Sequence, residues 1–153
     1  DSLTSEYAIK DNLQEEMLRI LLKRFIILCT RIAREKFSVS PEREKAFDMV
    51  RQFYVLVDNH FKEKKMVQDY ADMLHRSPKT LSNLFTTCGL PSPLRIIHER
   101  IEAEAKRLLL YSQKSAKEIT EILGFEDQAT FSRFFKKMTG ESVSEYRKRE
   151  KRE

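Results

Sequence analysis

The chain has 153 residues, of which 35% are charged and 41% are hydrophobic. That length can hold one or two small domains, and that composition excludes an intrinsically disordered chain. The formal net charge of +5 favours polyanionic partners only modestly and does not identify a nucleic-acid-binding protein by itself. Because the chain offers only three glycines and four prolines for turns, we expect an all-α fold.

Neither cysteine lies in a pattern typical of a metal site or a disulfide framework. Cys29 and Cys88 both fall in helical patterns, so we expect buried, reduced thiols in a cytoplasmic protein. The most apolar stretch, residues 17–33, is too short and too rich in Arg and Lys to span a bilayer, so no membrane partner is expected. The chain starts at Asp1 without a methionine, which indicates a fragment of a longer protein or a processed chain.

A first long helix is predicted from about residue 5 to residue 37. Its apolar stripe is wider than a solvated helix needs, and consists of Leu13, Met17, Leu18, Ile20, Leu22, Phe25, Ile27, Cys29 and Ile32. Such a stripe must pack against the next helix, a second copy of the chain in a homodimer, or a preceding domain. Packing against a neighbouring domain is more common than a dedicated dimer seam.

A second helix is predicted to start at Ser40 and Pro41, which suit the N-cap and the first helical position. It runs to about Phe61, with apolar residues at Phe47, Val50, Tyr54, Val57 and Phe61. We assign residues 1–62 to a helical linker, hairpin or dimerisation segment.

Two later stretches repeat one pattern, in which a short helix and a turn precede a helix with apolar residues spaced i, i+3, i+4 and i+7. In the first stretch, His75 and Arg76 form the turn, Ser77 and Pro78 start the second helix, and Gly89 follows its end. The first short helix carries Val67, Tyr70, Ala71 and Leu74, and the quartet of the second helix is Leu81, Leu84, Phe85 and Cys88.

The second stretch begins with a capping box, Ser115 to Glu118, in which the two side chains satisfy helix-start amides reciprocally. Gly124 and Phe125 form its turn, and Asp127 is the expected N-cap of the following helix. The short helix carries Ile119, Ile122 and Leu123, and the quartet is Phe131, Phe134, Phe135 and Met138, ahead of Gly140.

Two further helices complete the expected fold. A connecting helix starts at Ser92 and Pro93, and its predicted buried face is Leu94, Ile97, Ile101, Ala105 and Leu108. A last helix starts at a capping box formed by Ser142 and Glu145. Its basic end can be a solvated face or a phosphate contact, and carries Arg147, Lys148, Arg149, Lys151 and Arg152.

A chain that builds the same helix-turn-helix twice presents two second helices to a partner, and the major groove of DNA admits such a helix. The segment KEITEILGFEDQATFSRFFKKMTGESVSEYR, residues 117–147, resembles the second helix-turn-helix of AraC/XylS-type bacterial transcription regulators. VQDYADMLHRSPKTLSNLF resembles their first unit, and IIHERIEAEAKRLLL resembles their connecting helix. The chain departs from the family at Thr120, where Ala is usual, and at Val143, where Pro is usual.

The resemblance implies that residues 63–153 form a DNA-binding domain of two helix-turn-helix units held by the connecting helix. Both recognition helices would enter adjacent major-groove segments of double-stranded promoter DNA, roughly 34 Å apart. For an activator, the resemblance further implies contact with RNA polymerase. A rigid connecting helix can require the DNA to bend.

The faces opposite the two quartets are the predicted DNA contacts. The predicted base-reading residues are Lys79, Ser82, Asn83, Thr86, Gln128, Ala129, Ser132 and Arg133, and the predicted phosphate-binding residues are Thr80, Lys136 and Lys137. Arg133 can pair with guanine, Gln128 or Asn83 with adenine, and Ala129 with a thymine methyl group. The first unit carries Thr86 and Thr87 where many relatives carry basic residues, so we expect weaker phosphate anchoring there.

No catalytic pattern, nucleotide-binding loop or metal-ligand spacing is visible, since His60, His75 and His98 are scattered. We therefore expect neither an enzyme nor a cofactor. The alternative function is a helical protein-interaction module with an incidental basic charge. Salt distinguishes the two, because binding through several phosphate contacts weakens steeply as salt rises.

Overall fold

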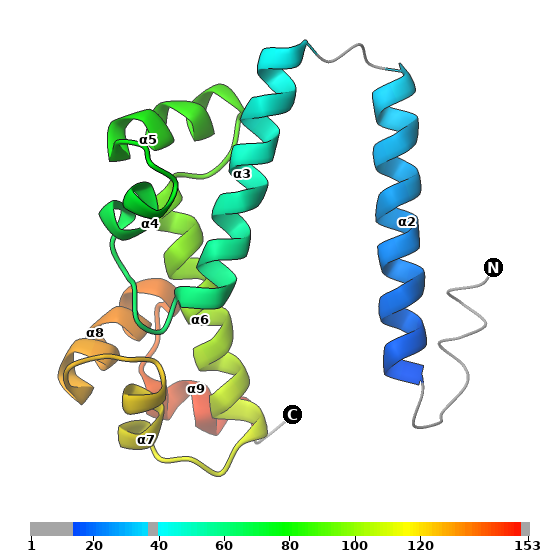
Figure 1. The fold of residues 1–153 in the computed structure, drawn as a ribbon. Helices are drawn as coiled ribbons and strands as arrows, with labels where there is room; N and C mark the ends of the chain where they lie inside the picture. Colours follow the sequence, from blue (N-terminus) through cyan, green and yellow to red (C-terminus); the bar gives the residue numbers. More distant parts are fainter. Residues whose placement is uncertain (1–13, 37–39, 151–153) are drawn as a thin grey trace. The chain divides into compact units, whose positions relative to one another are not determined.

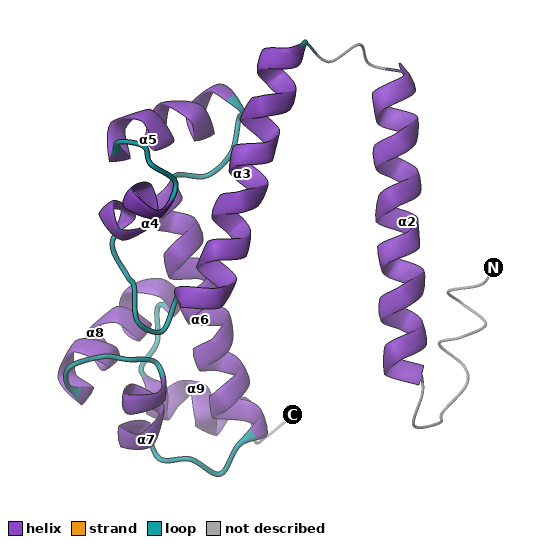
Figure 2. Cartoon of the chain, viewed as in Figure 1, coloured by secondary structure: helices purple, strands orange, loops and turns teal. Residues whose placement is uncertain are grey.

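The structure is a computed structural model that describes residues 14–36 and 40–150, and every regular element in these ranges is a helix (Figures 1 and 2). The helices are α2 (Gln14–Lys36), α3 (Pro41–His60), α4 (Val67–Met73), α5 (Pro78–Thr87), α6 (Pro93–Tyr111), α7 (Ala116–Ile122), α8 (Gln128–Thr139) and α9 (Val143–Glu150). The all-α prediction is confirmed for this part of the chain. None of the described helices combines the length and the apolar character that a membrane span requires.

The chain divides into two units, residues 1–44 and 45–153. Most of α3 therefore belongs to the same compact unit as the two helix-turn-helix stretches, whereas the sequence suggested a boundary near residue 62. The assignment of residues 1–62 to a linker or dimerisation segment concerns function and stays a prediction.

Within the unit formed by residues 1–44, α2 accounts for the described part of the first predicted helix. Residues 5–13 and 37 of that prediction, including Leu13 of the stripe, lie outside the described residues. The apolar side chains of α2 are largely exposed, with Leu22 at 53% and Phe25 at 55%. Cys29 is a free, exposed thiol, so its predicted burial is wrong. Cys88 is also free and half-buried.

The core of the second unit is built around α6, which contacts α4 and α5 on one part of its length and α7, α8 and α9 on another. Its buried residues include Ile97, Ile101, Ala105 and Leu108, as predicted. Leu94 was predicted to be buried and is 43% exposed, because Pro93 and Ile96 occupy the inward positions of the first turn.

α3 packs into this core through a spacing that differs from the predicted one. Val50 and Val57 are buried as expected, and so is Phe61 directly after the helix, but the remaining inward residue is Phe53 and not Tyr54, which is 40% exposed. Phe47 is also exposed, at 48%. The ring centroid of Phe53 lies 5.5 Å from that of Tyr70 in α4 and 5.0 Å from that of Phe85 in α5. α3 is thus part of the first helix-turn-helix core.

The predicted helix starts are confirmed by their hydrogen bonds. The Ser77 hydroxyl accepts from the Thr80 amide at 3.1 Å, and the Asp127 carboxylate accepts from the Thr130 amide at 2.7 Å. The capping box of α7 is complete, since the Ser115 amide donates to Glu118 at 2.7 Å and the Glu118 amide donates back at 3.2 Å. These bonds satisfy amides that a helix start otherwise leaves without partners.

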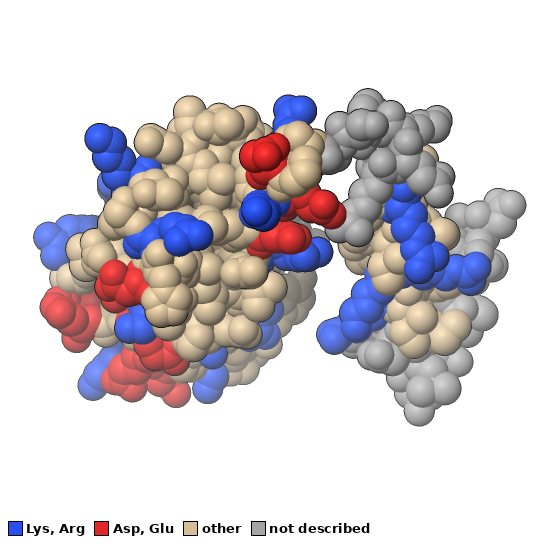
Figure 3. Space-filling model, turned by 45° about the horizontal axis from the view of Figure 1, so that its top comes forward, with Lys and Arg blue, Asp and Glu red and all other residues tan. Residues whose placement is uncertain are grey.

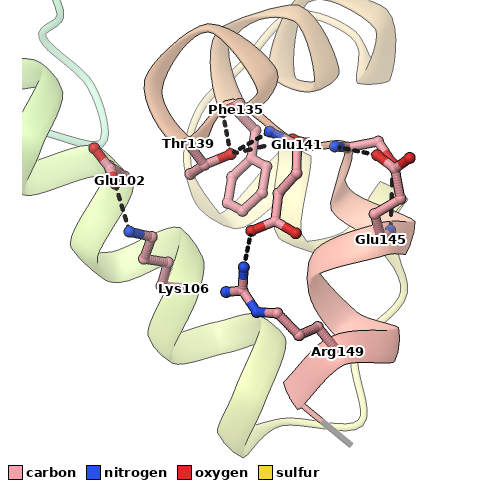
Figure 4. Close-up of polar contacts among 8 residues, drawn as sticks. Glu102, Lys106, Phe135, Thr139, Glu141, Glu145 and Arg149 are labelled. Carbon is pink, nitrogen blue, oxygen red and sulfur yellow. Dashed lines mark hydrogen bonds and ion pairs between the residues drawn. The ribbon is translucent and has the colours of Figure 1, made fainter.

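The junction between α8 and α9 is held by a compact set of polar contacts (Figure 4). The Thr139 hydroxyl lies 2.8 Å from the carbonyl oxygen of Phe135 and 3.1 Å from that of Glu141. Glu141 forms an ion pair with Arg149 across the junction. The Ser142 amide donates to the Glu145 carboxylate at 2.7 Å, which confirms the predicted capping box.

Both departures from the family pattern are accommodated by the packing. Thr120 is buried, and its hydroxyl donates to the carbonyl oxygen of Ala116 at 2.8 Å, so no polar atom is left without a partner. Val143 is buried at the start of α9, where the helix begins without the usual proline. Neither residue lies on the exposed face of α5 or α8.

Candidate nucleic-acid interface

α5 and α8 each divide into a buried face and an exposed face, as the quartets predicted. Leu81 and Phe85 of α5, and Phe131 and Phe135 of α8, have no exposed surface. The remaining quartet members are half-buried; Leu84, Cys88 and Phe134 pack against the core, and the fourth is Met138. The aromatic stripe of α8 is therefore core and leaves only the opposite face for a ligand.

The structure places almost all predicted contact residues on the exposed faces. Exposed side chains on α5 are Lys79, Thr80, Ser82, Asn83 and Thr86, and exposed side chains on α8 are Gln128, Ala129, Arg133, Lys136 and Lys137. Ser132 is half-buried, so it presents less surface than its neighbours. Each helix thus carries a mainly polar exposed face along its length, and the start of such a helix is the part that contacts base edges in helix-turn-helix proteins.

Each unit turns its chain sharply ahead of its second helix. In the first helix-turn-helix, His75 adopts a positive φ of 52°, and in the second helix-turn-helix, Gly124 adopts a φ of 67°. A non-glycine residue rarely adopts this backbone conformation. The predicted turns at His75-Arg76 and Gly124-Phe125 are confirmed, and the two units share one local geometry.

Arg133 is held by a short chain of hydrogen bonds at the start of α8. Its guanidinium donates to the Thr130 hydroxyl at 3.2 Å, and that hydroxyl donates to the Asp127 carboxylate at 3.0 Å. The hydrogen bond from the Thr130 amide lowers the pKa of Asp127, and the charge of Arg133 contributes in the same direction. The carboxylate is therefore ionised at neutral pH and keeps the arginine near the helix start.

The exposed face of α5 offers fewer donors than its residue types suggest. The Thr86 hydroxyl donates to the carbonyl oxygen of Ser82, and the Thr87 hydroxyl donates to that of Asn83, both at 2.9 Å. Such bonds to the preceding turn use the hydroxyl hydrogen inside the helix. Thr86 is consequently an acceptor or a methyl contact here, while Asn83 keeps its amide group for a partner.

The two lysines of α8 lie beside different helices. The positive charge of Lys137 contributes to a lowered pKa of His98 in α6, after the larger effect of burial. Lys136 acts on Glu145 of α9, whose pKa is lowered chiefly by its hydrogen bond with Ser142. Lys137 is therefore close enough to α6, and Lys136 to α9, for their charges to act on these groups.

Sequence reasoning missed the loop between α3 and α4, which holds three further lysines, Lys62, Lys64 and Lys65. The signal available was the run Lys-Glu-Lys-Lys directly after the predicted helix end. Over the face drawn in Figure 3, Lys and Arg side chains of the second unit alternate with Asp and Glu. Its basic charge is thus spread over that face and is not gathered in one large patch.

No group of His, Cys, Asp and Glu side chains suited to a metal ion occurs within residues 14–36 and 40–150. His60, His75 and His98 lie on α3, in the first turn and on α6 respectively. His98 packs edge-on against Phe134 at 5.3 Å between ring centroids, which gives it a packing role.

Comparisons with known proteins agree with this architecture. A family model described as a helix-turn-helix domain matches residues 70–149. The chain is 30% identical to the uncharacterized HTH-type transcriptional regulator YisR of Bacillus subtilis, over 79% of this chain and 41% of that protein. It is 36% identical to the arabinose operon regulatory protein of Salmonella typhimurium, over 60% of this chain and 31% of that protein.

Among solved structures, the C-terminal domain of AraT, a response regulator from Geobacillus stearothermophilus, is similar with a TM-score of 0.60. Its sequence identity is 28%, and the match covers 72% of this chain and 86% of that chain. The chain spans less than half the length of the curated relatives named above. On the family match, the relatives and the shared fold, the chain belongs to the AraC-type helix-turn-helix family of transcription regulators.

Proposed function

We propose that this chain is the DNA-binding part of a bacterial transcription regulator and that it reads promoter DNA with α5 and α8 together. The observation that carries the proposal is the repeated architecture, in which two helices of like sequence pattern bury one face and expose a polar one. Both units pack on α6, which spans them. The proposal includes a cytoplasmic location, no enzymatic activity, and contact with RNA polymerase if the regulator is an activator.

The roles proposed for individual residues follow from their chemistry and exposure. Arg133 can form two hydrogen bonds with a guanine, and Gln128 or Asn83 can do so with an adenine. Thr80, Lys136 and Lys137 are proposed to bind phosphates and to set the register on the duplex. Lys79, Ser82, Thr86, Ala129 and Ser132 complete the base-reading set.

A second candidate function is supported by α2, whose apolar side chains are about half-exposed. This surface would suit a helical protein-interaction module, including a homodimer. It carries Arg19, Lys23, Arg24 and Arg31 but no acidic residue between Met17 and Ala33. The two candidates are compatible, because α2 and the helix-turn-helix helices lie in different units.

The test is selection of binding sites from a random duplex library with this chain, followed by a salt titration on the selected duplex. We expect one sequence class to be enriched, and the logarithm of affinity to fall linearly with the logarithm of salt concentration. No enrichment at low salt, or affinity for a protein partner that salt leaves unchanged while DNA binding is absent, would favour the interaction module instead.

A further inference from the structure

The loop between α3 and α4 leads into the first helix-turn-helix unit but also touches the second. In Figure 1 this loop descends from α3 toward the helices of the second helix-turn-helix before it enters α4. Its Lys65 donates a hydrogen bond across 59 positions of sequence to the carbonyl oxygen of Gly124, at 2.8 Å. Gly124 is the turn residue directly ahead of the segment that starts α8.

Backbone meets backbone at this contact. A Cβ atom added to Gly124 would lie 2.0 Å from the carbonyl oxygen of Lys62 and 3.1 Å from the Lys65 ammonium. No real side chain fits at that distance, so the glycine allows the loop to seat directly on the turn. The positive φ of Gly124 is a second reason for glycine at this position.

The Lys65 ammonium closes the contact. It donates to the carbonyl oxygen of Lys62 at 2.6 Å as well as to that of Gly124, and lies 5.1 Å from the centroid of the Phe125 ring. An ammonium group has three donors, and a cation over an aromatic face is attracted by the ring. The side chain is half-buried, and this burial lowers the pKa of Lys65.

The other side of the loop contacts the first helix-turn-helix and α6. The Tyr70 hydroxyl of α4 donates to the carbonyl oxygen of Lys64 at 2.8 Å. Phe61 is buried at the loop's start, with the Arg100 guanidinium of α6 lying 4.1 Å from its ring centroid. Arg100 also donates to Asp58 of α3 at 2.7 Å. The loop is therefore fixed where it leaves α3 and where it enters α4.

Two separate links thus join the units that carry α5 and α8. One is α6, a single helix of 19 residues, and the other is the loop seated on the Gly124 turn. Packing on α6 holds each helix-turn-helix unit to the same helix, and a second contact at a distance from α6 further restricts tilting and twisting of one unit relative to the other.

We propose that Lys65 is a positioning residue, which bridges the carbonyl groups of Lys62 and Gly124 and so fixes the separation and orientation of the two recognition helices. In consequence, Lys65 determines how strictly the protein requires one spacing between its two DNA segments. This consequence rests on the proposed function, while the fixed geometry of the two units does not.

The variant Lys65→Met tests the proposal, because it keeps the length of the side chain and removes its charge and donors. Lys62→Met is the matched control: it removes one exposed positive charge from the same loop and leaves the Lys62 carbonyl oxygen in place. Lys65→Arg restores a cation with several donors. Circular dichroism and thermal unfolding identify any variant that fails to fold.

The first readout needs no DNA. Spin labels at cysteines replacing Ser82 and Gln128, with Cys29 and Cys88 changed to Ala, report the distance between α5 and α8 by pulsed electron paramagnetic resonance. We expect a narrow distance distribution for the parent and Lys62→Met, and a clearly broadened or shifted one for Lys65→Met. Unchanged distributions in a folded Lys65→Met variant would overturn the proposal.

The second readout is affinity for selected duplexes in which one or two base pairs are inserted or removed between the two contacted segments. We expect each altered spacing to lower the affinity of the parent and of Lys62→Met about tenfold or more. Lys65→Met should bind the optimal duplex more weakly than the parent does, but an altered spacing should lower its affinity by less than about threefold. Lys65→Arg should recover much of the parent's spacing profile. A Lys65→Met profile parallel to the parent's would overturn the spacing claim. Absence of any DNA binding by the parent would overturn the proposed function and leave the distance measurement to decide the geometry.

Discussion

At the scale of single residues, stability should depend strongly on glycines whose backbone conformation or close contacts other residues cannot adopt. Gly124 combines a positive φ with a neighbouring carbonyl oxygen that leaves no room for a Cβ atom. Gly140 has a positive φ of 84° at the end of α8 but nothing within 4 Å of the added atom. The pair separates the effect of conformation from the effect of contact.

Gly140→Ala should lower the free energy of unfolding by about 1–2 kcal/mol, the usual penalty for an L-residue in the left-handed region. Gly124→Ala should lower it by about 3 kcal/mol or more, because the loop must also move away from the turn. Urea unfolding of the two variants checks this. Equal losses would show that the loop does not press on Gly124.

Stability should also depend on pH through the carboxylates at helix starts. The Ser115 amide bond lowers the pKa of Glu118, and the Thr130 amide bond lowers that of Asp127. A group with a lowered folded pKa stabilises the fold fully above its unfolded pKa of about 4, and loses that contribution as pH falls through the folded value. We expect the urea concentration at the midpoint of unfolding to decrease as the pH is lowered from 5 to 2.

Glu118→Gln should flatten this acid-induced fall, because the glutamine can still accept the Ser115 amide bond but does not titrate. Glu121→Gln, on the same helix but away from its start, is the control and should keep the parent's slope. If both variants follow the parent curve, the capping carboxylate of Glu118 does not contribute to the acid dependence of stability.

At the scale of elements, α3 shows how far sequence patterns reach. Its helix, its start at Pro41, two of its inward residues and the buried Phe61 directly after it could be predicted from spacing. The choice between Phe53 and Tyr54 could not, because both are aromatic neighbours and either completes an apolar stripe. The structure decides it through the rings of Tyr70 and Phe85, which come from helices distant in sequence.

Replacing Phe53 with Ala should therefore cost about 3–5 kcal/mol of unfolding free energy, as for a fully buried aromatic residue. Tyr54→Ala, which changes a side chain that is 40% exposed, should cost much less. Chemical unfolding followed by circular dichroism measures both. A larger loss for Tyr54→Ala would contradict the packing of α3 against α4 and α5.

The helix-turn-helix elements were more predictable because each carries local signals at both ends. Ser77, Ser92, Ser115 and Asp127 mark helix starts through side-chain bonds to nearby amides, and such bonds depend on neighbours in sequence. The link between Lys65 and Gly124 joins residues 59 positions apart, so no local pattern announces it. Exposure of the contact residues could be predicted, whereas the back-bonding of Thr86 required coordinates.

At the scale of the whole molecule, the unit formed by residues 45–153 contains two similar helix-turn-helix halves that both pack on α6. Each half supplies one helix with a polar, exposed face, and the two halves differ in chemistry. α8 carries Arg133, Lys136 and Lys137, whereas the exposed face of α5 carries one cation, Lys79, near its start. We expect α8 to supply most of the electrostatic attraction to DNA, and α5 to contribute mainly through Asn83 and neighbouring polar groups.

The central claim, that both helices read DNA, is tested most directly by selecting binding sites with Asn83→Ala, Arg133→Ala and the control Arg51→Ala beside the parent chain. Arg51 is an exposed arginine of α3, outside both recognition helices. Each recognition-helix variant should relax its own base position at a cost of about 1–3 kcal/mol in binding free energy, while Arg51→Ala keeps the parent's preferences. The two relaxed positions should lie about one helical turn, roughly 10 base pairs, apart. Relaxation at the same position by both variants, or at none by Asn83→Ala or Arg133→Ala, would contradict the account.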